Sequence, residues 1–142
     1  MAEVRFYDRV DDALLKFAVI ISKANGKWVL CKHRERSTYE VPGGHRESGE
    51  AIIDAARREL REETGAVDFT LKPICVYSVT GKTRVNEGDE SFGMLYFSEI
   101  HAFEEIHSEL EKIIFTDNLA VDWTYPDIQP RLIAEAKRRD IF

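Results

Sequence analysis

The chain has few cysteines and no long apolar run. Its two cysteines among 142 residues, Cys31 and Cys75, lie far apart and lack metal-ligand spacing, so we expect two buried, reduced thiols rather than a disulfide or a redox site. The longest purely apolar run, Phe17 to Ile21, is far below the roughly 20 residues of a membrane helix. The segment from Met1 to Asp12 is charged, unlike a signal peptide. We therefore expect a cytoplasmic protein with no membrane partner.

The chain also lacks an excess of positive charge. Its net charge is −6 and its pI is about 5.3, whereas binding along a nucleic acid needs a basic face. No repeat, low-complexity tract or Pro/Gly-rich linker divides the sequence. With 142 residues and 44% hydrophobic content, residues 1–142 are expected to form a single domain.

The apolar pattern predicts strands interrupted by one helix and followed by another. Ala24-Asn25-Gly26 suggests a hairpin turn between the first two strands, and Pro42-Gly43-Gly44 is expected to end a short third strand. The predicted strands are Leu14 to Ser22, Trp28 to His33, Glu40-Val41, Val67 to Thr80, Phe92 to His101 and Lys112 to Thr116. The order predicts helices packed on a mixed sheet.

The first helix is expected at Glu50 to Thr64, with Ser48 as N-cap and Gly65 after its end. The second is expected after Pro126, with basic residues in its last turn. At 100° per residue, the first helix has an apolar sector opposite a charged sector. The apolar sector contains Ile52, Ile53, Ala56 and Leu60; the charged one contains Glu50, Asp54, Arg57 and Arg61. The second helix has an apolar stripe of Leu132, Ile133 and Ala136.

Three carboxylates of the first helix do not fit this division. Glu59 and Glu63 fall beside the apolar sector, and Glu62 lies next to Ala51 and Ala55. A solvated helix with many salt bridges is the simplest interpretation of a charge run, but Glu59 has no cation at the i±3 or i±4 positions. Like charges at these spacings are mildly destabilising, and a divalent cation would offset the repulsion. Carboxylate oxygens suit a hard ion such as Mg²⁺.

The same segment matches a family motif. From Gly44 to Ala66 the chain reads GHRESGEAIIDAARRELREETGA, in which Gly44, Glu50, Arg58-Glu59-Leu60 and Glu62-Glu63 have the spacing of the Nudix box. The chain therefore resembles the Nudix family, whose members hydrolyse diphosphate bonds in nucleoside diphosphate derivatives. One position departs from the motif, since Ala66 occupies the final aliphatic slot.

The resemblance implies an α/β fold, a Nudix-like α/β/α sandwich with a mixed central sheet. It also implies a divalent cation, Mg²⁺ or Mn²⁺, held by the glutamates of the box. The expected metal ligands are Glu59, Glu62, Glu63 and the carbonyl of Gly44. Arg58 is expected to orient a carboxylate, with Glu50 as its candidate partner and two unrelated surface residues as the alternative.

A general base must accept the proton of the attacking water. In the family this base lies either in the box or in a later loop, so Glu63 competes with a later acidic group. That group consists of Glu104, Glu105, Glu109 and Glu111. Glu109 is preferred because it precedes the expected strand Lys112 to Thr116, although a solvated acidic loop explains the pattern equally well.

The substrate is less defined by the sequence. A basic stretch, Lys32 to Arg36, precedes the Gly-Gly loop, so Arg34 and Arg36 are candidate phosphate contacts. His33, in the same stretch, is more often structural than catalytic. Four aromatic residues could stack on a base: Tyr39, Tyr77, Phe92 and Trp123. Most aromatic residues belong to the core, and Tyr39 is the candidate for substrate binding.

Two functional classes remain at this stage. The first is a metal-dependent hydrolase of a small nucleotide, such as a damaged or surplus nucleoside triphosphate. The second is a Nudix-like ligand-sensing or regulatory module, which needs no metal carboxylates. The retained glutamates favour the hydrolase. An isomerase acting on an isoprenoid diphosphate would need a further acid or thiol pair that the sequence does not identify. A homodimer is compatible with either class.

Overall fold

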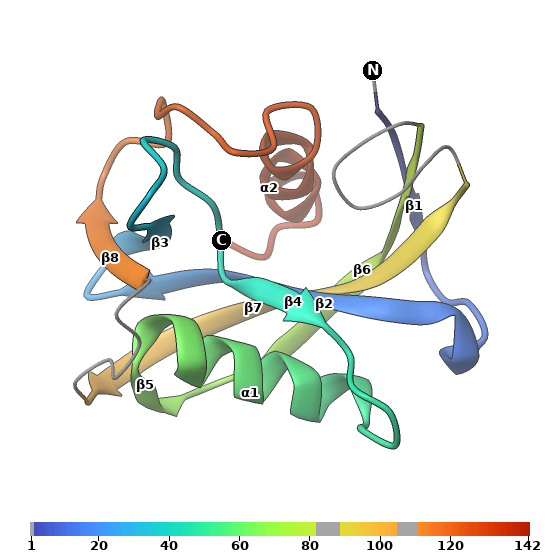
Figure 1. Ribbon diagram of the computed structural model, residues 1–142, viewed down its shortest axis with the longest axis horizontal. Helices are drawn as coiled ribbons and strands as arrows, with labels where there is room; N and C mark the ends of the chain where they lie inside the picture. Colours follow the sequence, from blue (N-terminus) through green and yellow to red (C-terminus); the bar gives the residue numbers. More distant parts are fainter. Residues whose placement is uncertain (1, 82–88, 105–110) are drawn as a thin grey trace.

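The computed structural model describes residues 2–81, 89–104 and 111–142. A central sheet separates two helices, with α1 on one face and α2 on the other (Figure 1). The helices are α1 (Ile52–Thr64) and α2 (Gln129–Arg138), and a short 3₁₀ helix covers Asp12–Leu14. The strands are β1 (Glu3–Tyr7), β2 (Leu15–Ala24), β3 (Lys27–His33), β4 (Gly43–His45), β5 (Ala66–Phe69), β6 (Lys72–Thr80), β7 (Ser91–Phe103) and β8 (Glu111–Thr116).

The sheet is mixed, and its strand order is β1-β6-β7-β2-β3-β8. β2 and β7 run parallel, whereas the other strand pairs of the described residues are antiparallel. β4 pairs with β2 and β5 pairs with β7, outside the main path. A mixed sheet between two helices confirms the predicted α/β/α sandwich.

The hairpin between β2 and β3 agrees with its sequence signal. Asn25 and Gly26 have φ values of 52° and 78°, the left-handed pair that a tight hairpin turn requires. The second helix is also confirmed, with Leu132, Ile133 and Ala136 buried along one side. Pro130 lies in its first turn, where a proline removes no intrahelical hydrogen bond.

The prediction that Pro42-Gly43-Gly44 ends a strand was wrong. Gly43 to His45 form β4, whereas Glu40 contributes only an isolated bridge with Cys31. A Cβ at Gly43 would lie 2.6 Å from the Ala18 carbonyl oxygen, so glycine allows β4 to approach β2 closely. The two glycines therefore form the strand instead of interrupting it.

Val67 to Thr80 also differs from the prediction of one long strand. The strand is interrupted at Thr70 and Leu71, and β5 and β6 pair with successive parts of β7 in the same direction. β7 spans 13 residues and is long enough to accept both. β1 was not predicted, because its charged residues hide the alternation of a strand that pairs only with β6.

α1 begins later than predicted and is rotated from the predicted wheel. Its N-cap is Ala51, which makes no side-chain capping bond, so the assignment of Ser48 was wrong. Ile53 is 38% exposed, whereas Ala55 is fully buried, because small alanines let the helix lie close to the sheet. Gly65, with φ of 78°, donates its N–H to the Arg61 carbonyl and ends the helix as expected.

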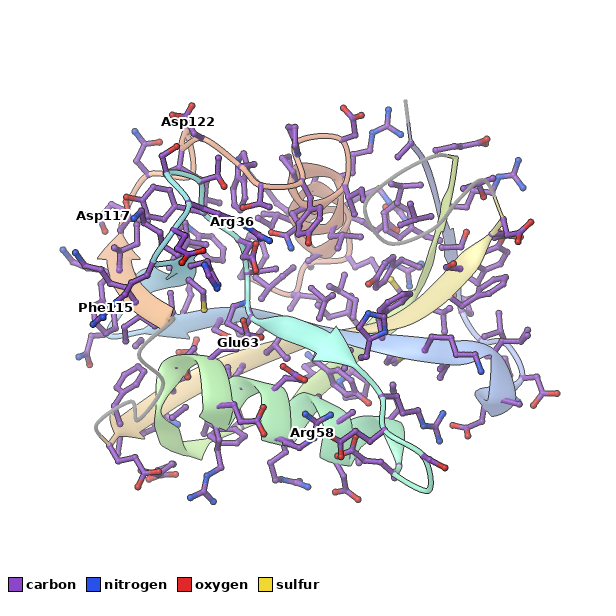
Figure 2. All side chains as sticks on the ribbon, in the orientation of Figure 1. Arg36, Arg58, Glu63, Phe115, Asp117 and Asp122 are labelled. Atoms are coloured by element: carbon purple, nitrogen blue, oxygen red, sulfur yellow. The ribbon has the colours of Figure 1, made fainter. Side chains whose placement is uncertain are left out.

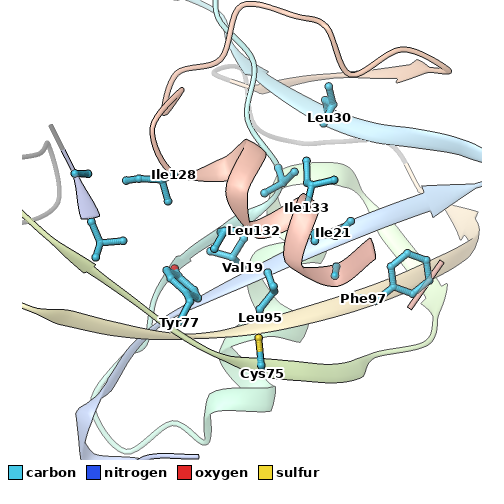
Figure 3. Close-up of a cluster of buried hydrophobic side chains, with 14 residues drawn as sticks. Val19, Ile21, Leu30, Cys75, Tyr77, Leu95, Phe97, Ile128, Leu132 and Ile133 are labelled. Atoms are coloured by element: carbon cyan, nitrogen blue, oxygen red, sulfur yellow. The ribbon is translucent and has the colours of Figure 1, made fainter. Parts of the chain in front are cut away.

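The core has two parts, one on each side of the sheet. On the α2 side, large side chains such as Ile21, Leu95, Phe97 and Leu132 pack together (Figure 3). On the α1 side, small residues predominate, including Ala18, Ala55 and Ala56. Cys31 and Cys75 are both free and buried, as predicted. Within the described residues, no helix has the length and apolar character needed to cross a membrane.

Candidate active site

The carboxylates of α1 meet the backbone of β4. The N–H of Gly43 donates to Oε1 of Glu63 at 2.9 Å, and the Glu63 residue is only 9% exposed. The Glu59 side chain lies directly against Gly44, where a Cβ would come within 2.5 Å of its carboxyl carbon. Glycine at position 44 is therefore needed for the Glu59 carboxylate to occupy this position. Figure 2 shows Glu63 between α1 and β4.

Arg58 orients this group from the solvent side of α1. Its Nε and Nη2 donate to the two oxygens of Glu50 at 2.8 and 2.9 Å, forming a bidentate pair. Its Nη1 donates to Oε1 of Glu59 at 2.8 Å, and Nη2 also donates to the His45 carbonyl at 2.9 Å. The guanidinium thus links the loop after β4 to Glu59. The pairing that the sequence suggested between Arg58 and Glu50 is present.

The two carboxylates that contact Arg58 have opposite pKa shifts. Hydrogen bonds from Arg58 and from the Glu47 backbone lower the pKa of Glu50 to about 2. Burial raises the pKa of Glu59, although the hydrogen bond from Arg58 opposes that shift. A neighbouring positive charge would stabilise the ionised form of Glu59. Glu59 is therefore a half-buried carboxylate that Arg58 compensates only in part, whereas Glu50 forms the bidentate pair with the same guanidinium.

The glutamates do not form a preorganised metal-binding site. Among the described residues, no group of three or more His, Cys, Asp and Glu is placed to hold a metal ion. Glu62 is 60% exposed and lies 3.6 Å from Nη1 of Arg58. Glu59 lies beside Gly44 and Glu63 beside Gly43, and these two carboxylates fit the preference of Mg²⁺ for one or two carboxylates plus water and substrate phosphates.

An arginine outside the sequence prediction supports the same loop. Arg46 follows β4, and its Nε donates to the Glu50 carbonyl at 2.6 Å. Its Nη2 donates to Asp12 at 2.8 Å, and Nη1 donates to the Asp12 and Leu15 carbonyls. The loop that presents Glu50 to Arg58 is thereby tied to the start of β2. No local pattern distinguishes Arg46 from other basic residues, because its partners are backbone carbonyls and a distant aspartate.

The later acidic residues are only partly described. Glu104 follows β7 and pairs with Arg61 at 3.6 Å, with both side chains about half exposed. Glu111 begins β8, and its partner in the sheet register is His33. Glu105 and Glu109 lie outside the described residues. Glu109 as general base therefore stays a prediction.

The predicted substrate residues are spread over the loop between β3 and β4. Arg34 is exposed, and Arg36 lies 3.7 Å from Glu40. Figure 2 places Arg36 on the α2 side of the sheet and Arg58 on the α1 side. Tyr39 packs against the core, and its backbone hydrogen-bonds with Asp122 and Thr124. The structure therefore does not bring Arg34, Arg36 and Tyr39 into one cluster with the carboxylates.

A pocket of about 150 Å³ opens on the α2 side of β4. Gly43 and Gly44 line it, so the backbone that contacts Glu63 and Glu59 also forms a wall of this pocket. Its polar lining residues include Glu40, His45, Tyr77, Tyr125 and Gln129. The sequence analysis did not identify Gln129 as a pocket residue. A signal was present, because Gln129 precedes Leu132 by three residues and Ile133 by four, which places a polar side chain on the apolar stripe of α2.

Comparison with known proteins agrees with this geometry. The family model described as NUDIX domain matches residues 14–131, so the chain belongs to the Nudix family. A curated relative from Bacillus subtilis (strain 168), named putative 8-oxo-dGTP diphosphatase YtkD, is 39% identical over 90 residues. That match covers 63% of this chain and 53% of the relative, so the chain spans about half of the relative's length.

Solved structures show the same fold. A mutant of the Bacillus subtilis pyrophosphohydrolase BsRppH aligns with a TM-score of 0.74 and 26% identity, covering 96% of this chain and 90% of that one. A NUDIX hydrolase from Nitrosomonas europaea aligns with a TM-score of 0.68 and 19% identity, covering 90% and 95%. The predictions of family and fold class are thus confirmed.

Proposed function

We propose that the protein is a metal-dependent diphosphatase that hydrolyses a diphosphate bond in a nucleoside di- or triphosphate derivative. The observation that carries the proposal is the placement of Glu59 and Glu63 against Gly44 and Gly43, with Arg58 fixing Glu59. The relatives support the reaction class, since one is named a diphosphatase and another a pyrophosphohydrolase.

In the proposed site, Glu59, Glu63 and the Gly44 carbonyl would hold Mg²⁺, for which Mn²⁺ could substitute, and Glu62 would supplement them. A cation held there would supply charge neutralisation for phosphate oxygens and a lowered pKa for a bound water. Glu63 or Glu109 accepts the proton of the attacking water. A new P–O bond forms to the water oxygen, and the bridging P–O bond breaks with its electron pair leaving on the departing phosphate.

Arg58 serves this reaction by positioning. Its bidentate pair with Glu50 limits the rotation of the guanidinium, and the guanidinium in turn holds Glu59. Arg34 and Arg36 remain candidate phosphate contacts, although they lie in the loop between β3 and β4 and not among the carboxylates. We also propose a cytoplasmic location and a role in removing damaged or surplus nucleotides. The Bacillus subtilis relative is named for an oxidised nucleotide, 8-oxo-dGTP.

The test is phosphate or diphosphate release from a panel of nucleoside di- and triphosphates by the purified protein, with Mg²⁺, with Mn²⁺ and in excess EDTA. Turnover of at least one nucleotide only with divalent cation is expected. Undiminished turnover in EDTA would exclude the metal mechanism. Nucleotide binding without turnover in any buffer would favour a ligand-sensing module over an enzyme.

A further inference from the structure

Arg46, directly after β4, uses its guanidinium on the protein itself. Its Nε donates to the Glu50 carbonyl at 2.6 Å, and Nη1 donates to the carbonyls of Asp12 and Leu15 at 3.0 and 3.3 Å. Nη2 donates to Oδ2 of Asp12 at 2.8 Å, so four of the five N–H donors of the guanidinium have protein partners. The side chain is 19% exposed. Arg46 therefore joins two segments of the chain and has little capacity left to bind a phosphate.

The segment that Arg46 holds is a compact turn from Glu47 to Glu50. Gly49 has φ of +77°, the Glu50 N–H donates to the Glu47 carbonyl at 3.1 Å, and Oε1 of Glu50 accepts from the Glu47 N–H at 3.0 Å. The backbone N–H of Arg46 donates to the Lys16 carbonyl at 2.8 Å, next to the paired residues of β4 and β2. Figure 1 shows this turn and the 3₁₀ helix at the same end of the sheet. Arg46 thus attaches the turn to the start of β2.

The helix that follows this turn has no side-chain cap. Ala51 is the N-cap of α1 and makes no capping hydrogen bond, whereas Ser, Thr, Asp or Asn at this position accepts from the N–H groups of the first turn. No cap side chain therefore fixes how the chain enters α1. The bond from Arg46 to the Glu50 carbonyl, one residue before the N-cap, restrains that entry instead. The placement of the first turn of α1 thus depends on a side chain outside the helix.

The same turn is connected with Glu59. Glu50 accepts the bidentate pair from Arg58, and Arg58 donates through Nη1 to Oε1 of Glu59. The side chains of all three residues are at most 22% exposed, so salt in solution screens these contacts only weakly. Arg46 is linked to Glu59 in this way, although the two residues share no hydrogen bond in the described part of the chain.

We propose, resting on the proposed function, that Arg46 is a positioning residue for Glu59, the proposed cation ligand. It acts by holding the turn that presents Glu50 to Arg58, and not through its charge alone. A guanidinium suits this role because its planar fork reaches partners from three nitrogens at fixed angles, whereas a lysine ammonium is a point donor. Loss of the fork releases the turn, and a small displacement of groups around a reacting substrate costs rate.

Steady-state kinetics of Arg46→Met, Arg46→Lys and a control test the proposal in the full chain. Arg46→Met keeps an apolar stem and should lower kcat roughly tenfold while KM stays within about twofold, because substrate still binds but Glu59 is less well placed. Arg46→Lys restores the charge without the fork and should remain several-fold impaired. The control is Arg57→Met, which removes the same charge from the exposed side of α1, where Arg57 pairs with Asp54. It should match the parent.

Two further measurements do not depend on turnover. Calorimetric titration with Mn²⁺ in the absence of nucleotide should show several-fold weaker binding to Arg46→Met, less than the roughly 10- to 100-fold typical of losing a direct partner of a ligand. Hydrogen exchange should be faster at the Glu50 N–H, which closes the turn onto Glu47, in the Arg46 variants and not in Arg57→Met. Unchanged Mn²⁺ affinity with unchanged exchange in Arg46→Met would overturn the proposal, as would full activity of Arg46→Lys.

A double-mutant cycle tests the route through Glu50. Glu50→Gln weakens the pair with Arg58, so the variant that combines it with Arg46→Met should lose little more kcat than the more impaired single variant. If the two losses multiply instead, Arg46 acts independently of Glu50 and the proposed route is overturned.

Thermal melts establish that each variant folds, and Arg46→Lys carries the test if Arg46→Met does not fold. The proposed function fails separately, because its failure appears in the parent. A parent that hydrolyses no nucleotide with any divalent cation would contradict the proposed function, and hydrogen exchange would still decide whether Arg46 holds the turn. Normal metal-dependent turnover in a folded Arg46→Met would contradict the positioning role alone.

Discussion

The two faces of the sheet use their helices differently. On one face, Ala55 and Ala56 bring α1 close to the sheet, and its charged residues converge on the glycines of β4. On the other, Leu132 and Ile133 of α2 pack among large side chains and leave a pocket beside the same strand. Small residues thus position the candidate active-site carboxylates, whereas large residues form the walls of the pocket. β4 belongs to both regions because Gly43 and Gly44 have no side chain to obstruct either one.

The largest expected effect comes from removing one charge on the α1 face. Glu59→Gln should lower turnover by about 10² or more, on the order of 3 kcal/mol in the barrier. Its stability in EDTA should equal or slightly exceed that of the parent, because burial disfavours the ionised carboxylate and Glu62 repels it. Saturating Mg²⁺ should reverse this order, since the parent gains the full binding term.

Thermal melts in EDTA and in Mg²⁺, with one activity assay, measure both parts of that prediction. Asp54→Asn is the matched control, because it removes one charge from the exposed side of the same helix, where Asp54 pairs with Arg57. A Glu59→Gln protein with normal turnover and equal destabilisation in both buffers would contradict the metal assignment.

A smaller effect is expected from filling the space between α1 and β4. Gly44→Ala places a Cβ 2.5 Å from the Glu59 carboxyl carbon, so that side chain must move. Overpacking typically costs about 1–3 kcal/mol, and the displacement should lower kcat about tenfold or more. Urea unfolding and steady-state kinetics would measure the two quantities.

Gly26→Ala separates the catalytic loss from general destabilisation. Gly26 has φ of +78° and no atom near an added Cβ, so alanine there is strained at the hairpin turn without touching the site. It should reduce stability by about 1 kcal/mol and leave kcat unchanged. Equal losses of kcat in both variants would show that Gly44 has no special role beside Glu59.

Much of the α1 face could be predicted from sequence, because its signals are local. Glu59, which has no cation at helical spacing, and the spacing from Gly44 to Glu63 predicted the candidate site before any tertiary contact was known. The pairing of Arg58 with Glu50 also followed from the motif. The rotation that buries Ala55 and exposes Ile53 could not, because the closeness of approach to the sheet decides it.

The α2 face was harder to predict, because its features depend on residues far apart in the chain. The pocket joins β2, β4, β6 and α2, and no sequence window contains all four. Likewise, β4 was predicted as a break because Pro-Gly-Gly is a turn signal, whereas contact with Ala18 makes it a strand. The splitting of Val67 to Thr80 depended on the length of β7.

The smallest expected effect is on stability and comes from an ion cluster on α2, formed by Glu135, Arg138 and Arg139, which lies apart from the charged residues of α1. Arg138 and Arg139 donate to Glu135 at 2.6 to 2.9 Å, and these hydrogen bonds lower its pKa to about 2. Because the folded-state pKa lies below the ordinary value of 4.5, the stabilisation is fully present above pH 4.5 and is lost as pH falls toward 2. Arg138 is mostly exposed, so the contribution at neutral pH is about 1–2 kcal/mol.

Glu135→Gln should therefore lower the free energy of unfolding by that amount at pH 7, and the difference from the parent should shrink as pH falls from 4.5 to 2. Urea unfolding at several pH values measures this difference.

Glu3→Gln is the control, since Glu3 and Arg5 form a pair with both side chains more than half exposed, and it should change stability little at any pH. Turnover at neutral pH should be unchanged in Glu135→Gln, because Glu135 neither lines the pocket nor contacts the α1 carboxylates. A constant stability difference down to pH 2 would show that packing, and not the ion cluster, accounts for the role of Glu135; a large loss of turnover would show that the two faces are coupled through α2.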